Sequence, residues 1–368
     1  MNNSRIKEIY IIMAQWQKIQ IYRDNGELVE AQAPIIISAS RSTDIPAFYS
    51  DWFFNRLKKG YSAWTNPFNG VRSYVSYKNT RFIVFWSKDP LPLLQYIKEL
   101  KELNIGCYIQ YTLNEYEKEG LEQGVRPLVE RINTFKILVD KLGLGSIIWR
   151  FDPMILTENN SLENLIDKVR NIGNQLKGYT EKLVFSYADI QNYKKVKHNL
   201  DISGIHYHEW TEEQMDEFAR MLSMINKEEG WHFQLATCGE KIDISKYGIE
   251  HNRCIDGDLI VRLAWQDKQL MNYLKVKIEN LPAPSLFGET TLPDGAVLLP
   301  HNHYFVSSHR KDVGQRQFCE CMASKDIGEY NTCPHLCEYC YANATKQLAI
   351  DNWKRHQQNK DTETITGK

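Results

Sequence analysis

The sequence lacks the features that would place the protein in a membrane or on a nucleic acid. No apolar run in its 368 residues is long enough to cross a bilayer, and no signal-peptide cleavage pattern follows the short apolar patch at residues 9–14. Lys and Arg total 45 against 46 Asp and Glu, a net charge of −1, and the two signs are interspersed. These absences predict a cytoplasmic protein without a membrane partner, and the charge gives no indication of a nucleic-acid partner.

Several familiar catalytic motifs are also missing. The chain has no P-loop, no G-x-G-x-x-G after a strand, no H-E-x-x-H and no G-x-S-x-G. Phosphoryl transfer, Rossmann-type dehydrogenation, zincin proteolysis and α/β-hydrolase chemistry therefore have no support. No repeat of the length typical of solenoids is present either.

What the sequence does contain is an alternation of short apolar runs and helix-like segments. The runs cover residues 34–38, 61–65, 81–86, 107–112, 146–150, 183–187 and 232–237. The helix-like segments between them include residues 47–59, 92–103, 127–142, 161–176 and 211–228. Strands that alternate with helices predict a mostly parallel sheet. The predicted fold class is α/β, a full or partial (β/α) barrel.

The predicted domain organisation has four parts. Residues 1–33 form an N-terminal extension and a β-hairpin whose turn is Asp24-Asn25-Gly26, and the globular pattern begins just after Met13. Residues 34–300 form the barrel-like domain, which ends in a connector rich in Pro and Gly at residues 280–299. Residues 301–356 form a C-terminal cysteine-rich module, and residues 357–368 are expected to be a disordered tail.

The eight cysteines are unevenly distributed. Three are scattered, and five fall within the last fifty residues: Cys319, Cys321, Cys333, Cys337 and Cys340. A secreted disulfide scaffold would be smaller and would spread its cysteines along the chain. A tight group in a large cytoplasmic protein indicates a metal or iron–sulfur site.

The spacing of Cys333, Cys337 and Cys340 is the most specific signal in the chain. Gaps of three and two residues let one loop present three thiolates to three irons of a [4Fe–4S] cluster. The fourth iron then lacks a protein ligand from this loop, and an open iron can bind a small molecule.

This loop, with Tyr339 just before its third cysteine, resembles the signature of the radical S-adenosylmethionine (radical SAM) enzymes. The resemblance implies that the open iron binds S-adenosylmethionine and that the reduced cluster splits it to a radical that abstracts hydrogen from substrate. It also implies a full or partial barrel and an electron donor such as a flavodoxin or ferredoxin. Tyr339 and Asn343, in and beside the loop, are the cofactor-binding candidates.

A second resemblance extends over most of the chain. It rests on Ser40-Arg-Ser-Thr-Asp-Ile-Pro46, Thr65-Asn-Pro-Phe-Asn69, Phe85-Trp-Ser-Lys-Asp-Pro90, Trp149-Arg-Phe-Asp-Pro153, Thr237-Cys-Gly-Glu240 and Asp326-Ile-Gly-Glu-Tyr330. These segments resemble the bacterial family named domain of unknown function 1848. That resemblance implies the fold and the cluster but no substrate.

The cysteines stand at the C-terminal end of the chain, whereas radical SAM enzymes carry them after the first barrel strand. The loop must therefore fold back over the open face of the barrel, or the barrel order must be permuted. The alternative is a closed structural zinc site that adds Cys319 or Cys321 to the other three cysteines. Further ligand candidates are His301, His303, His309 and His335.

Cys319 and Cys321 also predict a second metal site. On a strand, residues two apart face the same side, and Cys238 and Cys254 would complete a set of four thiolates. The alternatives are that Cys319 and Cys321 are spare thiols, or that one of them caps the open iron of the first cluster.

Polar residues that follow the apolar runs are the candidates for chemistry, because active sites of (β/α) barrels lie at the strand ends. We expect Arg41, Asp44, Lys88, Arg150 and Asp152 to be catalytic and to converge on one cavity. Arginines can clamp a carboxylate or phosphate, although Arg41–Asp44 and Arg150–Asp152 can equally be structural ion pairs. The full set of such positions also includes Asn66, Asn69, Asp89, Gln110, Thr112, Ser186, Asp189 and Glu240.

The predicted function is a radical SAM-type enzyme that binds a [4Fe–4S] cluster and S-adenosylmethionine and acts on an unknown small-molecule or macromolecular substrate. One alternative is a nucleic-acid lesion repair enzyme resembling spore photoproduct lyase, which the neutral net charge disfavours. The other is a non-enzymatic protein with a structural zinc or iron–sulfur site.

Overall fold

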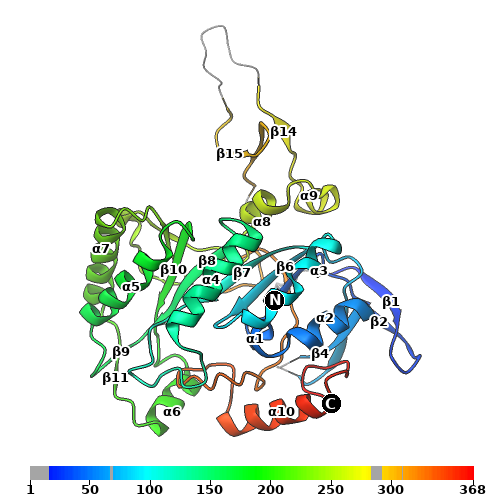
Figure 1. Ribbon diagram of the computed structural model, residues 1–368, viewed down its shortest axis with the longest axis horizontal. Coiled ribbons are helices and arrows are strands. Elements are labelled where there is room, and N and C mark those ends of the chain that lie inside the picture. The colour runs from blue at the N-terminus through cyan, green and yellow to red at the C-terminus, as the bar shows by residue number, and fades with distance from the viewer. Residues whose placement is uncertain (1–15, 67–68, 283–291, 309) are drawn as a thin grey trace, which may run out of the picture.

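The computed structural model describes residues 16–66, 69–282, 292–308 and 310–368, and its centre is one sheet of eight parallel strands (Figure 1). In spatial order the strands are β13 (Ile249–His251), β12 (Gln234–Thr237), β10 (Lys182–Tyr187), β8 (Ile147–Met154), β7 (Gly106–Thr112), β6 (Phe82–Ser87), β3 (Ile36–Ala39) and β17 (Lys325–Asp326). The α/β class with a large parallel sheet is confirmed. The full barrel is wrong: in the described residues no pairing joins the edge strands β13 and β17. These strands have only three and two residues, so they offer few hydrogen bonds with which to close the sheet.

Helices connect the strands, as parallel pairing requires. Their bounds are α1 Ile45–Phe48, α2 Ser50–Lys59, η1 Leu91–Tyr96, α3 Ile97–Glu102, α4 Leu128–Leu142, α5 Leu162–Leu176, α6 Lys194–Ile202, α7 Glu212–Glu228, η2 Ser245–Tyr247, α8 Gly257–Ala264, α9 Lys268–Leu274 and α10 Lys346–Gln358. The start of α7 is fixed by a capping box, in which the Thr211 and Gln214 side chains each bind the other's backbone N–H. In the part of the chain that is described, no helix combines the length and apolarity needed to span a bilayer.

The two faces of the sheet are buried in different cores. Along β6, Ile83 and Phe85 belong to the larger core, which is lined by α2, α4, α5 and α7. Phe82 and Val84 point the other way, into a smaller core that includes α8 and α9. We call this second side the inner face. Because side chains alternate along a strand, the inner face also carries Trp86, at the carboxyl end of β6.

One predicted strand, at residues 61–65, belongs to a different sheet. The strand β4 (Tyr61–Thr65) pairs antiparallel with β5 (Arg72–Ser76), and β1 (Lys18–Tyr22) and β2 (Leu28–Gln32) extend this sheet. The prediction of a parallel strand at residues 61–65 is wrong because the connection from β4 to β5 is too short for a crossover helix, so the chain turns back on itself. The β1–β2 hairpin forms where the sequence places it, while residues 1–15 of the predicted extension lie outside the described residues.

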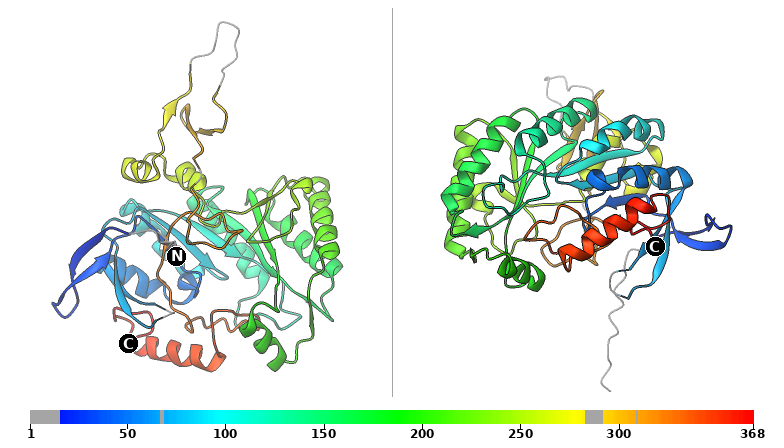
Figure 2. Two further views of the ribbon diagram at one scale, coloured as in Figure 1. Left: turned by 180° about the vertical axis from the view of Figure 1, so that it is seen from behind. Right: turned by 60° about the horizontal axis from the view of Figure 1, so that its bottom comes forward.

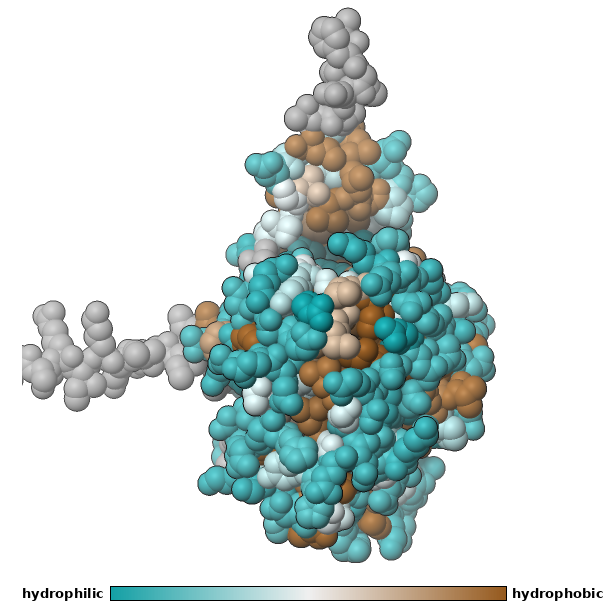
Figure 3. All heavy atoms as spheres, turned by 90° about the vertical axis from the view of Figure 1, so that its left-hand side faces the viewer, coloured by the Kyte–Doolittle hydropathy of each residue, from teal (hydrophilic) through white to brown (hydrophobic). Residues whose placement is uncertain are grey.

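The predicted connector at residues 280–299 lies partly in an arm that projects from the body (Figure 1). The arm contains an antiparallel sheet of β14 (Glu279–Asn280), β16 (His303–Val306) and β15 (Ala296–Leu299). Figure 3 shows apolar side chains gathered on this arm above a largely hydrophilic body, and Leu298 is 60% exposed there. A fourth small sheet pairs β9 (Leu156–Thr157) with β11 (Tyr207–His208).

The C-terminal segment returns to the sheet and crosses its lower edge before α10 (Figure 2). The carboxylate of Asp326 in β17 accepts hydrogen bonds from the Ser40 hydroxyl at 2.7 Å and the Arg41 backbone N–H at 2.9 Å. Gly328 makes this approach possible, because a Cβ there would lie 2.0 Å from the Ser40 Oγ. The sheet therefore gains its edge strand from the end of the chain.

The last residues are packed, so the predicted disordered tail is wrong. Ile365 is 1% exposed, and the backbone carbonyl of Thr362 accepts a hydrogen bond from Trp52 Nε1 at 2.9 Å. The Glu363 carboxylate binds Arg23 Nη2 at 2.9 Å. The polar composition of this segment predicted disorder. The segment is ordered because it contacts residues that lie more than 300 positions away in the sequence.

Candidate functional site

The cysteine loop, residues 333–340, lies across the carboxyl ends of the central strands. His335 Nε2 is 2.8 Å from the carboxylate of Asp44, which follows β3. The Tyr339 hydroxyl accepts a hydrogen bond from Nζ of Lys88, which follows β6, at 2.8 Å. The loop thus folds back over the sheet edge at which α/β proteins bind their ligands.

The loop brings three free thiols together. Cys337 is buried, while Cys333 and Cys340 are partly exposed. Burial raises the pKa of Cys337, against the pull of Lys88, and the neighbouring Cys333 and Cys340 raise it further. Burial and the nearby Cys340 likewise raise the pKa of Cys333. As bare thiolates these groups would repel one another, so an ionised triplet requires a bound cation or cluster.

Histidine does not supply a fourth donor to this loop. Both ring nitrogens of His335 are engaged, Nε2 by Asp44 at 2.8 Å and Nδ1 by the Gly124 carbonyl at 3.1 Å. Two other histidines considered as ligands, His301 and His303, lie beside Trp265, and His309 falls outside the described residues. The donor set at the loop is therefore three thiols.

A buried polar network lies beneath the loop. The Glu122 carboxylate binds Lys88 Nζ at 2.8 Å and Asn114 Nδ2 at 3.0 Å, and it accepts a hydrogen bond from the Tyr339 hydroxyl. Burial opposes ionisation of Glu122, but Lys88 and Arg131 outweigh it and hold the pKa below its usual value. Burial also disfavours the Lys88 ammonium, and the opposing charges of Glu122 and Cys337 keep its pKa raised. The network places one buried cation beside the thiol of Cys337.

Sequence reasoning missed Glu122 and Asn114. Asn114 follows the end of β7 by two residues, so the rule that selected other strand-end residues could have found it. Glu122 lies eight residues further along, in a stretch with no strand or helix, and nothing in the sequence marks it.

The other predicted residues gather on the inner face around Trp86. The guanidinium groups of Arg41 and Arg150 lie 5.2 and 5.3 Å from rings of Trp86, at cation–π distance. Arg150 is 2% exposed and donates from Nη1 to the Gln110 side chain at 3.2 Å. Nη2 of Arg41 is buried without a hydrogen-bond partner. One buried and one partly buried cation therefore flank one aromatic side chain.

Asp152 joins this group to the network beneath the loop. Its carboxylate binds Arg150 Nε at 3.1 Å and accepts a hydrogen bond from the Ser186 hydroxyl. Its backbone N–H donates to Asn114 Oδ1 at 3.1 Å. The five residues predicted as catalytic thus form two groups: Asp44 and Lys88 under the loop, and the other three on the inner face.

Cys319 and Cys321 lie on the inner face as well. The Met322 backbone N–H donates to the Ile255 carbonyl at 3.1 Å, so Cys321 lies beside Cys254, and Cys319 packs against the same core. Cys321 is 2% exposed. These two cysteines therefore form a group with Cys254 and not with the cysteine loop.

Neither cysteine group is preassembled around a bare ion. Within the described ranges, no set of three or more His, Cys, Asp or Glu side chains is arranged to hold a metal ion. A [4Fe–4S] cluster places its ligands on separate irons, so its cysteines stand further apart than the ligands of a single ion. The donors of the cysteine loop fit a cluster in number and chemistry.

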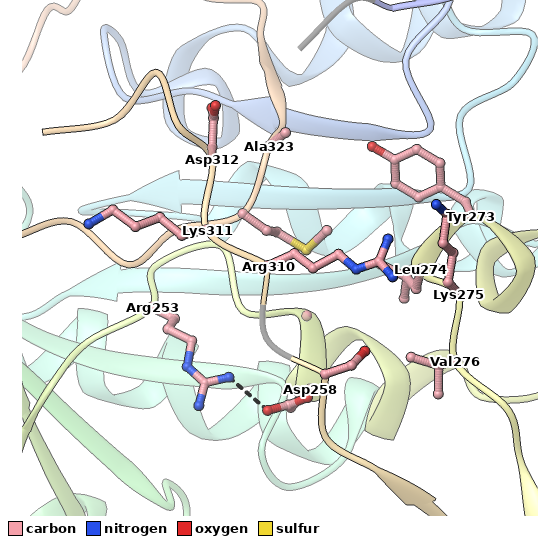
Figure 4. A pocket seen from close by; sticks show the side chains of 13 residues that line it. Arg253, Asp258, Tyr273, Leu274, Lys275, Val276, Arg310, Lys311, Asp312 and Ala323 are labelled. Carbon is pink, nitrogen blue, oxygen red and sulfur yellow. Dashed lines mark hydrogen bonds and ion pairs between the residues drawn. The ribbon is translucent and has the colours of Figure 1, made fainter. Parts of the chain in front are cut away.

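A separate pocket of about 370 Å³ lies between α8, α9 and the segment that leads to β17 (Figure 4). Arg253 and Asp258 form an ion pair on its wall at 2.7 Å, and Lys275, Arg310 and Lys311 also line it. None of the residues predicted as catalytic or metal-binding lines this pocket.

The fold and the site define an α/β protein with an open parallel sheet and a cysteine loop over its strand ends. The family model for domain of unknown function 1848 matches residues 36–342, and the chain belongs to this family. No curated protein and no solved structure matches the chain.

Proposed function

We propose that this protein is a radical SAM-type enzyme, with a [4Fe–4S] cluster on Cys333, Cys337 and Cys340 and S-adenosylmethionine bound beside it. One observation carries the proposal: a loop with three thiols lies over the carboxyl ends of the strands, where α/β proteins hold substrates. A metal centre at this edge is adjacent to the strand-end arginines and carboxylates.

The number of ligands favours a cluster that retains an open position. A structural zinc site is closed by four protein donors. The loop offers three thiols, and His335, the nearest nitrogen ligand in sequence, is committed to Asp44 and Gly124. A three-thiol set leaves one metal position for an exogenous ligand.

Unpartnered polar atoms near the loop support a bound group. The Asn343 side-chain oxygen is buried without a hydrogen-bond partner, while its Nδ2 donates to the Cys333 carbonyl at 2.9 Å. The Thr43 hydroxyl, after β3, is also buried and unpartnered. A buried polar atom without a partner costs about 1–3 kcal/mol, and hydrogen bonds to a ligand would offset this.

When bound, the reduced cluster would supply the electron that splits S-adenosylmethionine. The protein's own residues would hold the cysteine loop in position and offset the negative charge of the metal centre. Lys88 places a positive charge beside Cys337 and so favours a negatively charged metal centre. The Tyr339 hydroxyl is held by Glu122, Lys88 and Asn114, and its role is to fix the loop in place.

Arg41, Arg150 and Asp152 are the proposed substrate-binding groups. Arg150 is fixed by Asp152 and Gln110, so little side-chain entropy would be lost on binding an anionic or polar group. The Asp152 side chain is 24% exposed and remains accessible. The proposal also requires an electron donor, for which a flavodoxin or ferredoxin is the expected class.

The first experiment tests the cluster. Protein purified anaerobically should be brown and hold about four iron and four sulfide at the loop. Replacing Cys333, Cys337 and Cys340 together with Ala should remove that iron, whereas Cys107→Ala, a buried thiol of β7, should leave it unchanged. Unchanged iron content in the triple variant, or zinc in place of iron at the loop, would overturn the assignment.

The second experiment tests the reaction. Loaded and reduced protein should cleave S-adenosylmethionine to 5′-deoxyadenosine and methionine, slowly even without substrate. A loaded, reduced cluster that gives neither product nor a change in its electron paramagnetic resonance signal on addition of S-adenosylmethionine would indicate a structural or electron-transfer role.

A further inference from the structure

Four of the remaining cysteines meet on the inner face, although they come from three separate segments. Cys238 follows β12, Cys254 precedes α8, and Cys319 and Cys321 lie on the segment leading to β17. Cys238 Sγ is 3.3 Å from Cys254 Sγ. The Met322 backbone N–H donates to the Ile255 carbonyl at 3.1 Å, which brings Cys321 beside Cys254, and all four cysteines belong to the same smaller core. We call these four residues the thiol cluster, and all four are free thiols.

Three arginines lie near the thiol cluster. Arg150 Nη1 lies 3.3 Å from Cys254 Sγ. Arg41 is close enough to Cys254, Cys319 and Cys321 to interact electrostatically with all three. Arg316 interacts in the same way with Cys238 and Cys319.

One nitrogen of these arginines lacks a hydrogen-bond partner. Nη2 of Arg41 is buried without a hydrogen-bond partner. A buried guanidinium group is costly unless it faces an anion. Arg150 is already paired with the Asp152 carboxylate, and Arg41 interacts with that of Asp326; thiolates bound to a metal would give both arginines a further anionic partner on the side of the thiol cluster.

The arrangement also argues against a simple pair of disulfides. Cys238 and Cys321 both lie beside Cys254, so a disulfide from Cys254 to either one leaves the other without a partner. A disulfide between Cys238 and Cys254 would leave Arg150 Nη1, 3.3 Å from Cys254 Sγ, facing a neutral sulfur, whereas a thiolate would add to the negative charge that Asp152 already supplies. The Asn252 Nδ2 lies 3.1 Å from Cys254 Sγ and suits a sulfur that accepts hydrogen bonds.

We propose that Cys238, Cys254, Cys319 and Cys321 bind a second metal centre, closed by four thiolates and flanked by Arg41 and Arg150. On binding, the metal or cluster replaces the thiol protons, which pass to solvent. A tetrahedral ion with metal–sulfur bonds of about 2.3 Å holds its sulfurs about 3.8 Å apart. The Cys238–Cys254 pair, at 3.3 Å, must therefore open slightly, and the four thiols must rearrange around the metal as it binds. This centre has no open position and does not depend on the function proposed for the cysteine loop.

The test separates the two sites by variants. With Cys333, Cys337 and Cys340 all replaced by Ala, the protein should still contain about one zinc or about four iron per chain. Adding Cys319→Ala and Cys321→Ala should reduce this metal to background, whereas adding Cys107→Ala should not. The absorption spectrum of the loop-deleted protein distinguishes a colourless single ion from a coloured cluster, and either supports a four-thiolate centre.

A second measurement uses the unmodified protein in case a variant fails to fold. Under native anaerobic conditions, Cys238, Cys254, Cys319 and Cys321 should resist alkylation, and a strong chelator should expose all four together. A Cys238–Cys254 disulfide in anaerobically purified protein, or a metal content that Cys319→Ala with Cys321→Ala leaves unchanged, would overturn the inference. Metal in the thiol cluster of a protein whose loop binds none would overturn the proposed function alone.

Discussion

The two cysteine groups of this protein are built in opposite ways. The cysteine loop holds its three thiols within eight residues, 333–340, and the sheet contributes contacts that anchor the loop but no cysteine. The thiol cluster draws four cysteines from a span of 84 residues, 238–321, and forms only after β12, α8 and the C-terminal segment have packed. Local spacing therefore reveals the first group, whereas folding assembles the second.

Their electrostatic surroundings also differ. The loop is supported by a lysine that is itself paired with Glu122, so its positive charge is already balanced. The thiol cluster faces Arg41 and Arg150, and a nitrogen of Arg41 has no hydrogen-bond partner. The loop thus lies over an ion pair, whereas the thiol cluster faces two arginines, one of which has a buried nitrogen without a hydrogen-bond partner.

The largest expected effect on stability comes from removing the Lys88–Glu122 ion pair beneath the loop. Glu122→Gln removes the charge that balances Lys88; the Glu122 side chain is 2% exposed and that of Lys88 17%. The free energy of unfolding should fall by about 3–5 kcal/mol in denaturant titrations, and iron at the loop should be lost more readily. The exposed pair of Lys98 and Glu102 is the control, because Glu102→Gln should change stability by less than about 0.5 kcal/mol. Equal effects of the two substitutions would contradict the prediction.

Acid should lower the free energy of unfolding because His356, on α10, becomes protonated. Burial lowers the pKa of His356 from 6.5 to about 4, so its neutral form contributes stability above pH 6.5 that is lost as the pH falls toward 4. The loss amounts to about 3 kcal/mol. His356 packs against Tyr49, whose hydroxyl donates to the Thr332 carbonyl beside the loop.

His356→Gln should therefore flatten the decline in unfolding free energy between pH 7 and pH 4. His198→Gln, on an exposed position of α6, provides the matched control. If both variants keep the slope of the unmodified protein, His356 does not titrate as described.

A smaller change in stability should show whether Tyr339 anchors the cysteine loop or acts as a ligand of the metal. Tyr339→Phe removes a hydroxyl that contacts Glu122, Lys88 and Asn114. Stability should fall by about 1–3 kcal/mol while iron content is retained, since the hydroxyl is no ligand. Tyr341→Phe is the control, because that side chain is 44% exposed and binds only the Arg41 carbonyl. Loss of iron in Tyr339→Phe at unchanged stability would contradict the anchoring role.

The smallest predicted effects compare the asparagines that serve each group. Asn343 donates to the Cys333 carbonyl at 2.9 Å, and Asn252 contacts the Cys254 thiol at 3.1 Å. Each Asn→Ala substitution should cost about 1 kcal/mol in urea titrations. Metal analysis should find that each variant weakens only its own site. Crossed effects, with loop iron lost in Asn252→Ala, would mean that the two groups are not independent.

The sequence predicted the strands of the central sheet well, because buried parallel strands are continuous apolar runs bounded by helices. The prediction was wrong at residues 61–65, where the same pattern belongs to an antiparallel hairpin. An apolar run shows that a strand is buried but does not show which strand it pairs with. The sequence could not anticipate β17, because two residues carry no periodicity. The polar tail at residues 357–368 was misjudged for the same reason: its partners are distant in sequence.

By itself, then, the sequence determined what is local: the alternation of strands and helices, and the spacing of Cys333, Cys337 and Cys340, which lie on one loop in any fold. Only the tertiary structure decided that this loop returns to the strand ends through Asp44 and Lys88. It also decided that four distant cysteines meet beside Arg150. The physical reason is that spacing along the chain limits distances only over a few residues, while contacts between remote segments depend on how the whole core packs.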